Sequence, residues 1–155
     1  MLKNFKVDNL DKFIIENLTK SARTPFVEIA RMADVSGALI HQRVQKLEDE
    51  DVFKGSAFIL NPKGLGYLTC AFIGIQVNLL TPHTHVEVYN KISEIPEITE
   101  CHHVSGKYSL LVKIHTKNNE HLKNIIIEKI QSIQEITGTE TIISLQEGFI
   151  RQLKP

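Results

Sequence analysis

The chain has 155 residues, of which 42% are hydrophobic, and its 18 basic residues are balanced by 18 acidic ones. No stretch approaches the roughly 18 apolar residues that span a membrane, and the N-terminus lacks the apolar core of a signal peptide. Cys70 and Cys101 are too few for a disulfide-stapled secreted domain. We therefore expect a cytoplasmic protein of one domain or two small ones, with reduced thiols and no membrane partner.

Residues 8–20 predict a first helix. Asp8 or Asn9 has the side chain needed to cap its start. The apolar residues recur at helical spacing and form one face: Leu10, Phe13, Ile14, Ile15 and Leu18.

Residues 25–48 predict two short amphipathic helices joined by a tight turn. The first has an apolar stripe of Val27, Ile29 and Ala30, and the second one of Ile40, Val44 and Leu47. Ser36 has the side-chain oxygen that caps the second helix. Such a helix-turn-helix presents its second helix to the DNA major groove. We expect a small core of Phe13, Leu18, Ile29, Val35, Ile40, Val44 and Leu47.

The outward face of the second helix carries the candidate DNA contacts. His41 and Gln42 have hydrogen-bonding groups suited to base edges, and glutamine can pair with adenine through two bonds. Arg43 and Lys46 suit phosphate contacts, which position the protein without reading sequence. The predicted DNA-binding residues are Ser36, Ala38, His41, Gln42, Arg43, Gln45 and Lys46.

The charge balance opposes this interpretation. A DNA reader usually has a basic footprint, but this chain is neutral, and Glu48–Asp51 form an acidic run at the end of the second helix. The helices could instead form a bundle that contacts only protein. In that alternative the chain is a small-molecule-binding assembly protein without DNA binding.

A strand is predicted over Val52–Leu60, as one side of a small wing. Asn61–Gly66 follows, with one proline and two glycines, and marks the clearest boundary. We therefore expect a winged helix-turn-helix domain over 1–60 and a second domain over 61–155.

The second domain has the element order β-α-β-β-α-β. Alternating residues predict strands over 68–79, 98–104, 108–116 and 139–149. One helix opens at Thr81–Pro82, with Val86, Tyr89 and Ile92 as apolar residues, and another covers 118–133. This order predicts an α+β, ferredoxin-like fold with a four-stranded antiparallel sheet and both helices on one face.

Neither a metal centre nor an enzyme active site is predicted. Cys101 and His103 share one face of their strand, and His115 on the next strand could approach them, as zinc ligation requires. A packed thiol beside surface imidazoles is strongly favoured over a zinc site. The sequence has no phosphate-binding glycine loop, nucleophile elbow or pair of carboxylates in apolar surroundings, so we expect no catalytic residues, no metal and no cofactor.

The turn at Ser105–Ser109 has two readings. Gly106 permits backbone dihedrals closed to other residues and a close approach to a small molecule, and Tyr108 combines an apolar ring with a hydroxyl group. The turn could equally be a simple hairpin connection.

Taken together, these segments resemble the Lrp/AsnC family, the feast/famine transcription regulators of bacteria and archaea. The resemblance covers nearly the whole chain. It is carried by Leu10–Ile15, Glu28–Ala30, Val35–Ser36, Arg43–Glu48, Asn61–Pro62, Glu100–Gly106 and Thr139–Thr141, in that order and spacing.

The resemblance implies a regulator that binds double-stranded DNA and responds to an amino acid or related small molecule. It also implies homodimers, formed through the sheet domain, that assemble into tetramers, octamers or larger discs. By position, the implied effector-binding residues are Gly106, Lys107, Tyr108, Ser109, Thr139 and Thr141.

The chain departs from the family pattern in two places, the effector turn and the end of the recognition helix. Ser109 is neutral where many members have an acidic residue suited to an α-amino group, while Lys107 favours a carboxylate. Asp51 stands where a glycine commonly follows the recognition helix, and an aspartate tolerates left-handed backbone less well.

Overall fold

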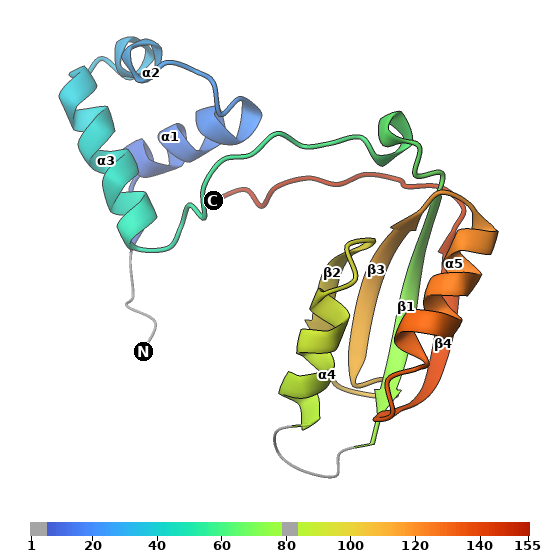
Figure 1. The fold of residues 1–155 in the computed structure, drawn as a ribbon. Coiled ribbons are helices and arrows are strands. Elements are labelled where there is room, and N and C mark those ends of the chain that lie inside the picture. The colour runs from blue at the N-terminus through green and yellow to red at the C-terminus, as the bar shows by residue number, and fades with distance from the viewer. Residues whose placement is uncertain (1–5, 79–83) are drawn as a thin grey trace. The chain divides into compact units, whose positions relative to one another are not determined.

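The computed structural model describes residues 6–78 and 84–155, and the chain divides into two compact units. One unit comprises Met1–Ile59 with Phe149–Pro155, and the other comprises Leu60–Gly148. None of the described helices is both long and apolar enough to cross a membrane. In chain order the elements are α1 (Asn9–Lys20), α2 (Phe26–Met32), α3 (Gly37–Asp49), the 3₁₀ turn η1 (Pro62–Leu65), β1 (Thr69–Val77), α4 (Thr84–Ser93), β2 (Ile98–His103), β3 (Leu110–Thr116), α5 (Asn119–Ile125), the π-helical turn η2 (Ile126–Ile130) and β4 (Ile136–Ser144), as Figure 1 shows.

The first unit contains the predicted helix-turn-helix, and side-chain caps fix where two of its helices start. Asp8 and Asp11 form a capping box at α1, each carboxylate accepting a hydrogen bond from the other residue's backbone N–H. Ser36 caps α3 by accepting a bond of 3.2 Å from the N–H of Leu39. The buried apolar residues are Ile14, Ile15, Ile29, Ala30, Ile40, Val44 and Leu47, and the other predicted core residues pack against them while partly buried.

The buried stripe of α2 differs from the prediction at one position. Val27 is exposed over 76% of its surface, whereas Phe26 packs against the helical core with Ile29 and Ala30. Residues three and four positions apart lie on the same face of a helix, so the stripe starts at Phe26 and excludes Val27.

The strand predicted over 52–60 does not form. Phe53 packs against the helical core, and its N–H donates to the carbonyl of Leu47. The following apolar residues Phe58, Ile59 and Leu60 are exposed. A strand needs a neighbouring strand to satisfy its backbone groups, and within 6–78 and 84–155 no segment pairs with 52–60.

The second unit has the predicted ferredoxin-like arrangement. The sheet order is β2-β3-β1-β4, and all three strand pairs are antiparallel. Helices α4 and α5 lie over the same face of the sheet (Figure 1), and their residues Val88, Ile92, Leu122 and Ile125 join its core. We call this the helix-covered face and the other the open face.

Strand alternation assigns each side chain to one of these faces. In β1, the buried Ala71, Ile73 and Ile75 point to the helix-covered face. Cys70, Phe72, Gly74 and Gln76 therefore belong to the open face. Residues directly opposite one another on neighbouring strands share a face, so this division extends to the whole sheet.

Several predicted boundaries shift. The helix predicted over 118–133 is α-helical only to Ile125 and continues as η2, where the N–H of Gln131 donates to the carbonyl of Ile126. Strand β4 begins and ends earlier than the predicted 139–149. The helix start predicted at Thr81–Pro82 lies outside the described residues. Val86 and Tyr89 of α4 are exposed, whereas Val88 and Ile92 are buried.

Candidate DNA-binding and effector-binding sites

The polar face of α3 points away from the helical core. Ala38, His41, Gln42, Gln45 and Lys46 are exposed, because the buried residues Ile40, Val44 and Leu47 occupy the opposite face. A shallow hollow of about 600 Å³ runs along this surface. It is lined by Leu39, Gln42, Arg43, Gln45, Lys46, Asp49 and Glu50.

Two of these exposed side chains are held by neighbours. The ring of His41 meets the ring of Phe26 edge-on, with 4.6 Å between their centroids. The side-chain amide of Gln45 donates to Asp49 over 3.1 Å. Both contacts restrict rotamers before any ligand binds. Gln42 is an exposed side chain near the middle of the face.

Arg43 lines the hollow, but its guanidinium group is paired with two carboxylates of the α1 region. Its Nη1 atom is 2.5 Å from the carboxylate of Asp8 and 3.0 Å from that of Asp11, which is completely buried. The hydrogen bond to Asp8 is the main reason why the pKa of Arg43 is raised. The position of Arg43 therefore does not support the predicted contact with DNA phosphate.

Gly106 gives the candidate effector turn its shape. Its φ of 116° is in the region that favours glycine, and a Cβ there would meet no atom within 4 Å. Ser109 closes the turn onto β1: its N–H donates to the carbonyl of Ile75, and its hydroxyl accepts a bond from the N–H of Val77.

Tyr108 and Lys107 belong to the open face of the sheet. The ring of Tyr108 covers Gly74, and a Cβ built on Gly74 would lie only 2.7 Å from it. The Tyr108 hydroxyl and the Lys107 ammonium both donate to Glu140 of β4. Gln76 completes this group by donating to the carbonyl of Lys107. We call Gln76, Lys107, Tyr108 and Glu140 the open-face cluster.

Charge pairing within the open-face cluster is mutual. The hydrogen bond from Lys107, followed by that from Tyr108, lowers the pKa of Glu140 below its ordinary value. The same carboxylate raises the pKa of Lys107. The cation that the sequence offered for a ligand carboxylate is thus already paired within the chain.

Thr139 and Thr141 belong to the opposite face. They lie opposite Ile75 and Ile73, whose side chains are buried beneath the helices. The side-chain amide of Gln131, just after η2, donates to the hydroxyl of Thr139 over 2.8 Å. The six predicted effector residues therefore gather at one end of the sheet, but the structure does not bring them together on one face.

Sequence reasoning missed two polar residues in this region, Glu140 and Gln131. Glu140 follows Thr139 directly, and strand alternation could have assigned it to the other face. Its pairing with Tyr108 depends on strand register, which the sequence does not reveal. Gln131 reaches Thr139 from its place just after η2, and the sequence carries no recognisable signal for that π-helical turn.

The proposed grouping of Cys101, His103 and His115 does not form. Cys101 lies opposite Val112 and packs against the core on the helix-covered face. His115 lies opposite Cys70 on the open face, and burial lowers its pKa. In the described part of the chain no three metal-ligating side chains come together.

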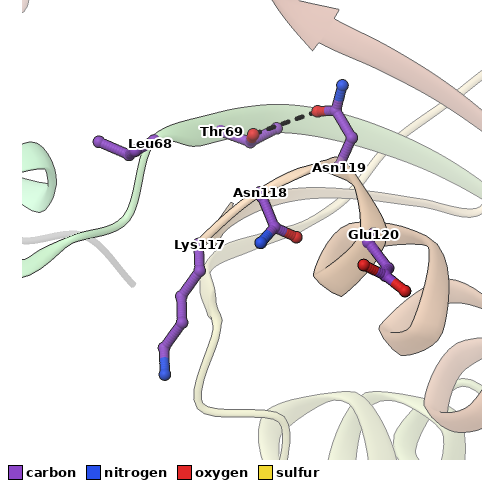
Figure 2. Close-up of a pocket in the computed structure, with 6 residues that line it drawn as sticks. All are labelled: Leu68, Thr69, Lys117, Asn118, Asn119 and Glu120. Atoms are coloured by element: carbon purple, nitrogen blue, oxygen red, sulfur yellow. Dashed lines mark hydrogen bonds between the residues drawn. The ribbon is translucent and has the colours of Figure 1, made fainter.

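A second hollow lies where β1 begins and α5 starts, as Figure 2 shows. It measures about 480 Å³, and Thr69 donates to Asn119 across it. Its lining residues are Leu68, Thr69, Lys117, Asn118, Asn119 and Glu120, none of which the sequence predicted as a site.

Comparisons with known proteins match both units. The AsnC-type helix-turn-helix domain matches residues 7–48, and the Lrp/AsnC ligand binding domain matches residues 70–152. Regulatory protein AsnC of Haemophilus influenzae is 38% identical over 96% of this chain and 98% of its own length.

Solved structures agree with the fold. The structure of Escherichia coli AsnC superposes with a TM-score of 0.90 and 36% identity, covering 97% of this chain and 100% of that one. The feast or famine regulatory protein of Mycobacterium tuberculosis, solved in complex with L-methionine, gives a TM-score of 0.86 at 24% identity. It covers 97% of this chain and 100% of that one, and it shows similarity of fold.

Proposed function

The chain belongs to the Lrp/AsnC family of transcription regulators, and we propose that it reads specific DNA sequences through α3 and responds to an amino acid bound in its second unit. The observation that carries this proposal is the capped α3, which buries one apolar stripe and exposes Ala38, His41, Gln42 and Gln45. We assign it no catalytic activity, and we expect it to act in the cytoplasm, where a regulator meets DNA.

Recognition of the DNA bases is proposed to depend mainly on Gln42, with support from its neighbours. A glutamine amide can both donate to and accept from adenine in the major groove. His41 is held by Phe26 at the start of the same surface. Lys46 is retained as a phosphate contact because it is an exposed cation on α3. Arg43 is not retained, since it pairs with Asp8 and Asp11.

The effector is proposed to bind at the end of the sheet where Gly106, Ser109, Thr139 and Thr141 lie, with Gln131 added to the set. The hydroxyl groups of the two threonines and the amide of Gln131 are neutral donors and acceptors, suited to a zwitterionic amino acid. The relative from M. tuberculosis, solved with L-methionine, supports this ligand class.

Self-association is proposed through the open face of the sheet. Phe72 and Leu111 are only partly buried there, and Ile142 is 54% exposed. Covering such an apolar surface favours a second copy of the chain, paired by two-fold symmetry. A dimer would present two α3 helices to half-sites about one DNA turn apart, and larger assemblies would add further contacts.

Footprinting against DNA from upstream of the chain's own gene tests DNA reading. We expect a protected region that survives competition by unrelated DNA. Absence of protection even at low salt would contradict the proposal. Light scattering on the same sample should give the mass of a dimer or a multiple of it.

Thermal shift against the twenty amino acids tests the effector independently. We expect one chemical class to raise the melting temperature and to change the scattering mass or the footprint. A chain that binds an amino acid but protects no DNA would support the assembly protein without DNA binding.

A further inference from the structure

Asp11 is an unusual residue in the helical unit because its carboxylate has no contact with solvent. Its exposed fraction is 0%, although it lies within a unit of fewer than seventy residues. A buried charge is costly unless it is paired and hydrogen-bonded. Here the pairing comes from Arg43, 32 residues further along the chain, at 3.0 Å.

Asp8 extends this pair into a three-residue group. It accepts a hydrogen bond from Arg43 over 2.5 Å and forms the capping box of α1 with Asp11. One guanidinium group therefore joins the first turn of α1 to the middle of α3. We call Asp8, Asp11 and Arg43 the α1–α3 clamp.

We propose that Arg43 is a positioning residue for DNA reading, which fixes the rotation of α3 through the α1–α3 clamp and makes no phosphate contact. This inference rests on the proposed function, since it assumes that α3 reads DNA. It assigns a part in sequence recognition to Asp8 and Asp11, which lie outside the two helices α2 and α3.

The geometry of a helix explains why one anchored residue is enough. Successive residues are turned by about 100° around the helix axis. Fixing Arg43 against α1 therefore fixes the direction in which its neighbour Gln42 projects. Guanidinium is a rigid planar donor, so it holds this direction better than an ammonium group on a flexible stem.

The apolar stripe alone gives weaker control of rotation. Ile40, Val44 and Leu47 anchor α3 by burial, and burial is not directional. The charged hydrogen bonds of the clamp are directional. A small rotation of α3 would preserve most of the apolar contact and break the clamp.

The test measures DNA affinity over a series of salt concentrations for Arg43→Ala, Arg43→Lys and Asp11→Asn in the full chain. Each protein is assayed with the footprinted fragment and with an unrelated duplex, below its melting temperature. Lys12→Ala is the matched control, because Lys12 is an exposed cation beside Asp11 on α1.

We expect both Arg43 variants to lower the ratio of specific to non-specific affinity by about tenfold or more, the effect of losing one good base contact. The slope of log affinity against log salt should stay at the wild-type value. A lost phosphate contact would instead reduce this slope by about 0.9. Lys12→Ala should leave the ratio unchanged.

Asp11→Asn gives the sharpest comparison, because it removes a negative charge. If electrostatic attraction to DNA governed the result, affinity would rise for both duplexes. The clamp predicts the opposite for the specific fragment, since Arg43 would then be held by Asp8 alone and the rotation of α3 would be less firmly fixed. A lower ratio of specific to non-specific affinity in Asp11→Asn, with the salt slope unchanged, would support the inference.

Three results would overturn it. They are a reduced salt slope in Arg43→Ala, a gain of affinity for both duplexes in Asp11→Asn, or a lower melting temperature with an unchanged specificity ratio. A wild-type chain without any sequence preference would overturn the proposed function itself, and the inference with it. The first three results leave the proposed function standing.

Discussion

The aromatic ring of Tyr108 lies directly against the backbone of Gly74, in the space where any other residue would have its Cβ atom. The distance from an ideal Cβ to the ring would be 2.7 Å. The glycine in β1 thus allows the candidate effector turn to fold over the sheet and reach Glu140.

Gly74→Ala should therefore destabilise the second unit. The added methyl group forces Tyr108 off its position, and overpacking of this kind costs about 1–3 kcal/mol. The measurement is urea denaturation of the full chain. Gly64→Ala is the control, since its Cβ would meet only Asn61 at 3.9 Å. Gly74→Ala in a Tyr108→Ala background should cost much less, and an equal cost in both backgrounds would refute the contact.

Asp51→Gly should stabilise the chain. Asp51 has a φ of 57°, and a left-handed backbone costs a residue with a side chain about 1 kcal/mol relative to glycine. The greater chain entropy of unfolded glycine offsets at least about 0.5 kcal/mol of this cost, so urea denaturation should show a net gain of up to about 0.5 kcal/mol. Glu50→Gly is the matched control: it removes the same charge at a φ of −92° and should lower stability.

Thr139→Val should abolish the thermal shift caused by the effector. The substitution keeps the shape of the side chain and removes the hydroxyl group that Gln131 contacts. Tyr108→Phe removes a hydroxyl group from the other face of the sheet and should leave the shift in place. If Tyr108→Phe abolished the shift and Thr139→Val did not, the effector would bind at the open-face cluster instead.

Gln42→Ala and Lys46→Ala should affect DNA binding differently. Loss of Gln42 should reduce discrimination at one base pair by about 1–3 kcal/mol. Loss of Lys46 should weaken binding to all sequences and reduce the salt slope by about 1. Affinity measured on a set of single-base operator variants separates the two effects, and uniform losses for Gln42→Ala would argue against base reading.

The pKa of Asp8 should lie below its ordinary value of 3.8, mainly because the N–H of Asp11 donates to it and secondarily because of Arg43. A carboxylate whose pKa is lowered by folding stabilises the folded state above its unfolded pKa. That stability is lost as pH falls from about 3.8 through the folded pKa. Carboxyl-carbon NMR should show the pKa of Asp8 rising in Arg43→Ala while remaining below 3.8. No change would mean that the ion pair is absent in solution.

Much of the fold can be predicted from patterns within short segments of the sequence. The caps at Asp8 and Ser36 depend on a few consecutive residues, and the alternation in β1 is visible without knowledge of its partners. These features gave the three helices and the β-α-β-β-α-β order. The strand predicted at 52–60 is wrong, because alternation can be seen within one segment, whereas a strand also requires a second segment to pair with.

The candidate sites were less predictable, because they depend on partners distant in sequence. Arg43 has the positive charge and the position on the second helix that suit a phosphate contact. Only the fold shows that Asp8 and Asp11 lie beside it. The sequence suggests Lys107 as a partner for a ligand carboxylate, but β4 brings Glu140 to it. The family resemblance groups Thr139 and Thr141 with Tyr108, whereas the strand register places them on the other face of the sheet.

The turn at Ile126–Ile130 has a consequence for how this chain tolerates length changes. A π-helical turn accommodates one residue more than an α-helical turn does, with the hydrogen bond spanning five residues instead of four. Deleting one residue there would restore a regular α-helix, and because the wide turn absorbs the extra residue, α5 before it and Gln131 after it would keep their directions. The apolar contact of α5 with the sheet and the bond from Gln131 to Thr139 would then survive. The second unit is therefore more tolerant of a single-residue deletion in this turn than of one within α5, where the deletion would turn the preceding residues by about 100° around the helix axis.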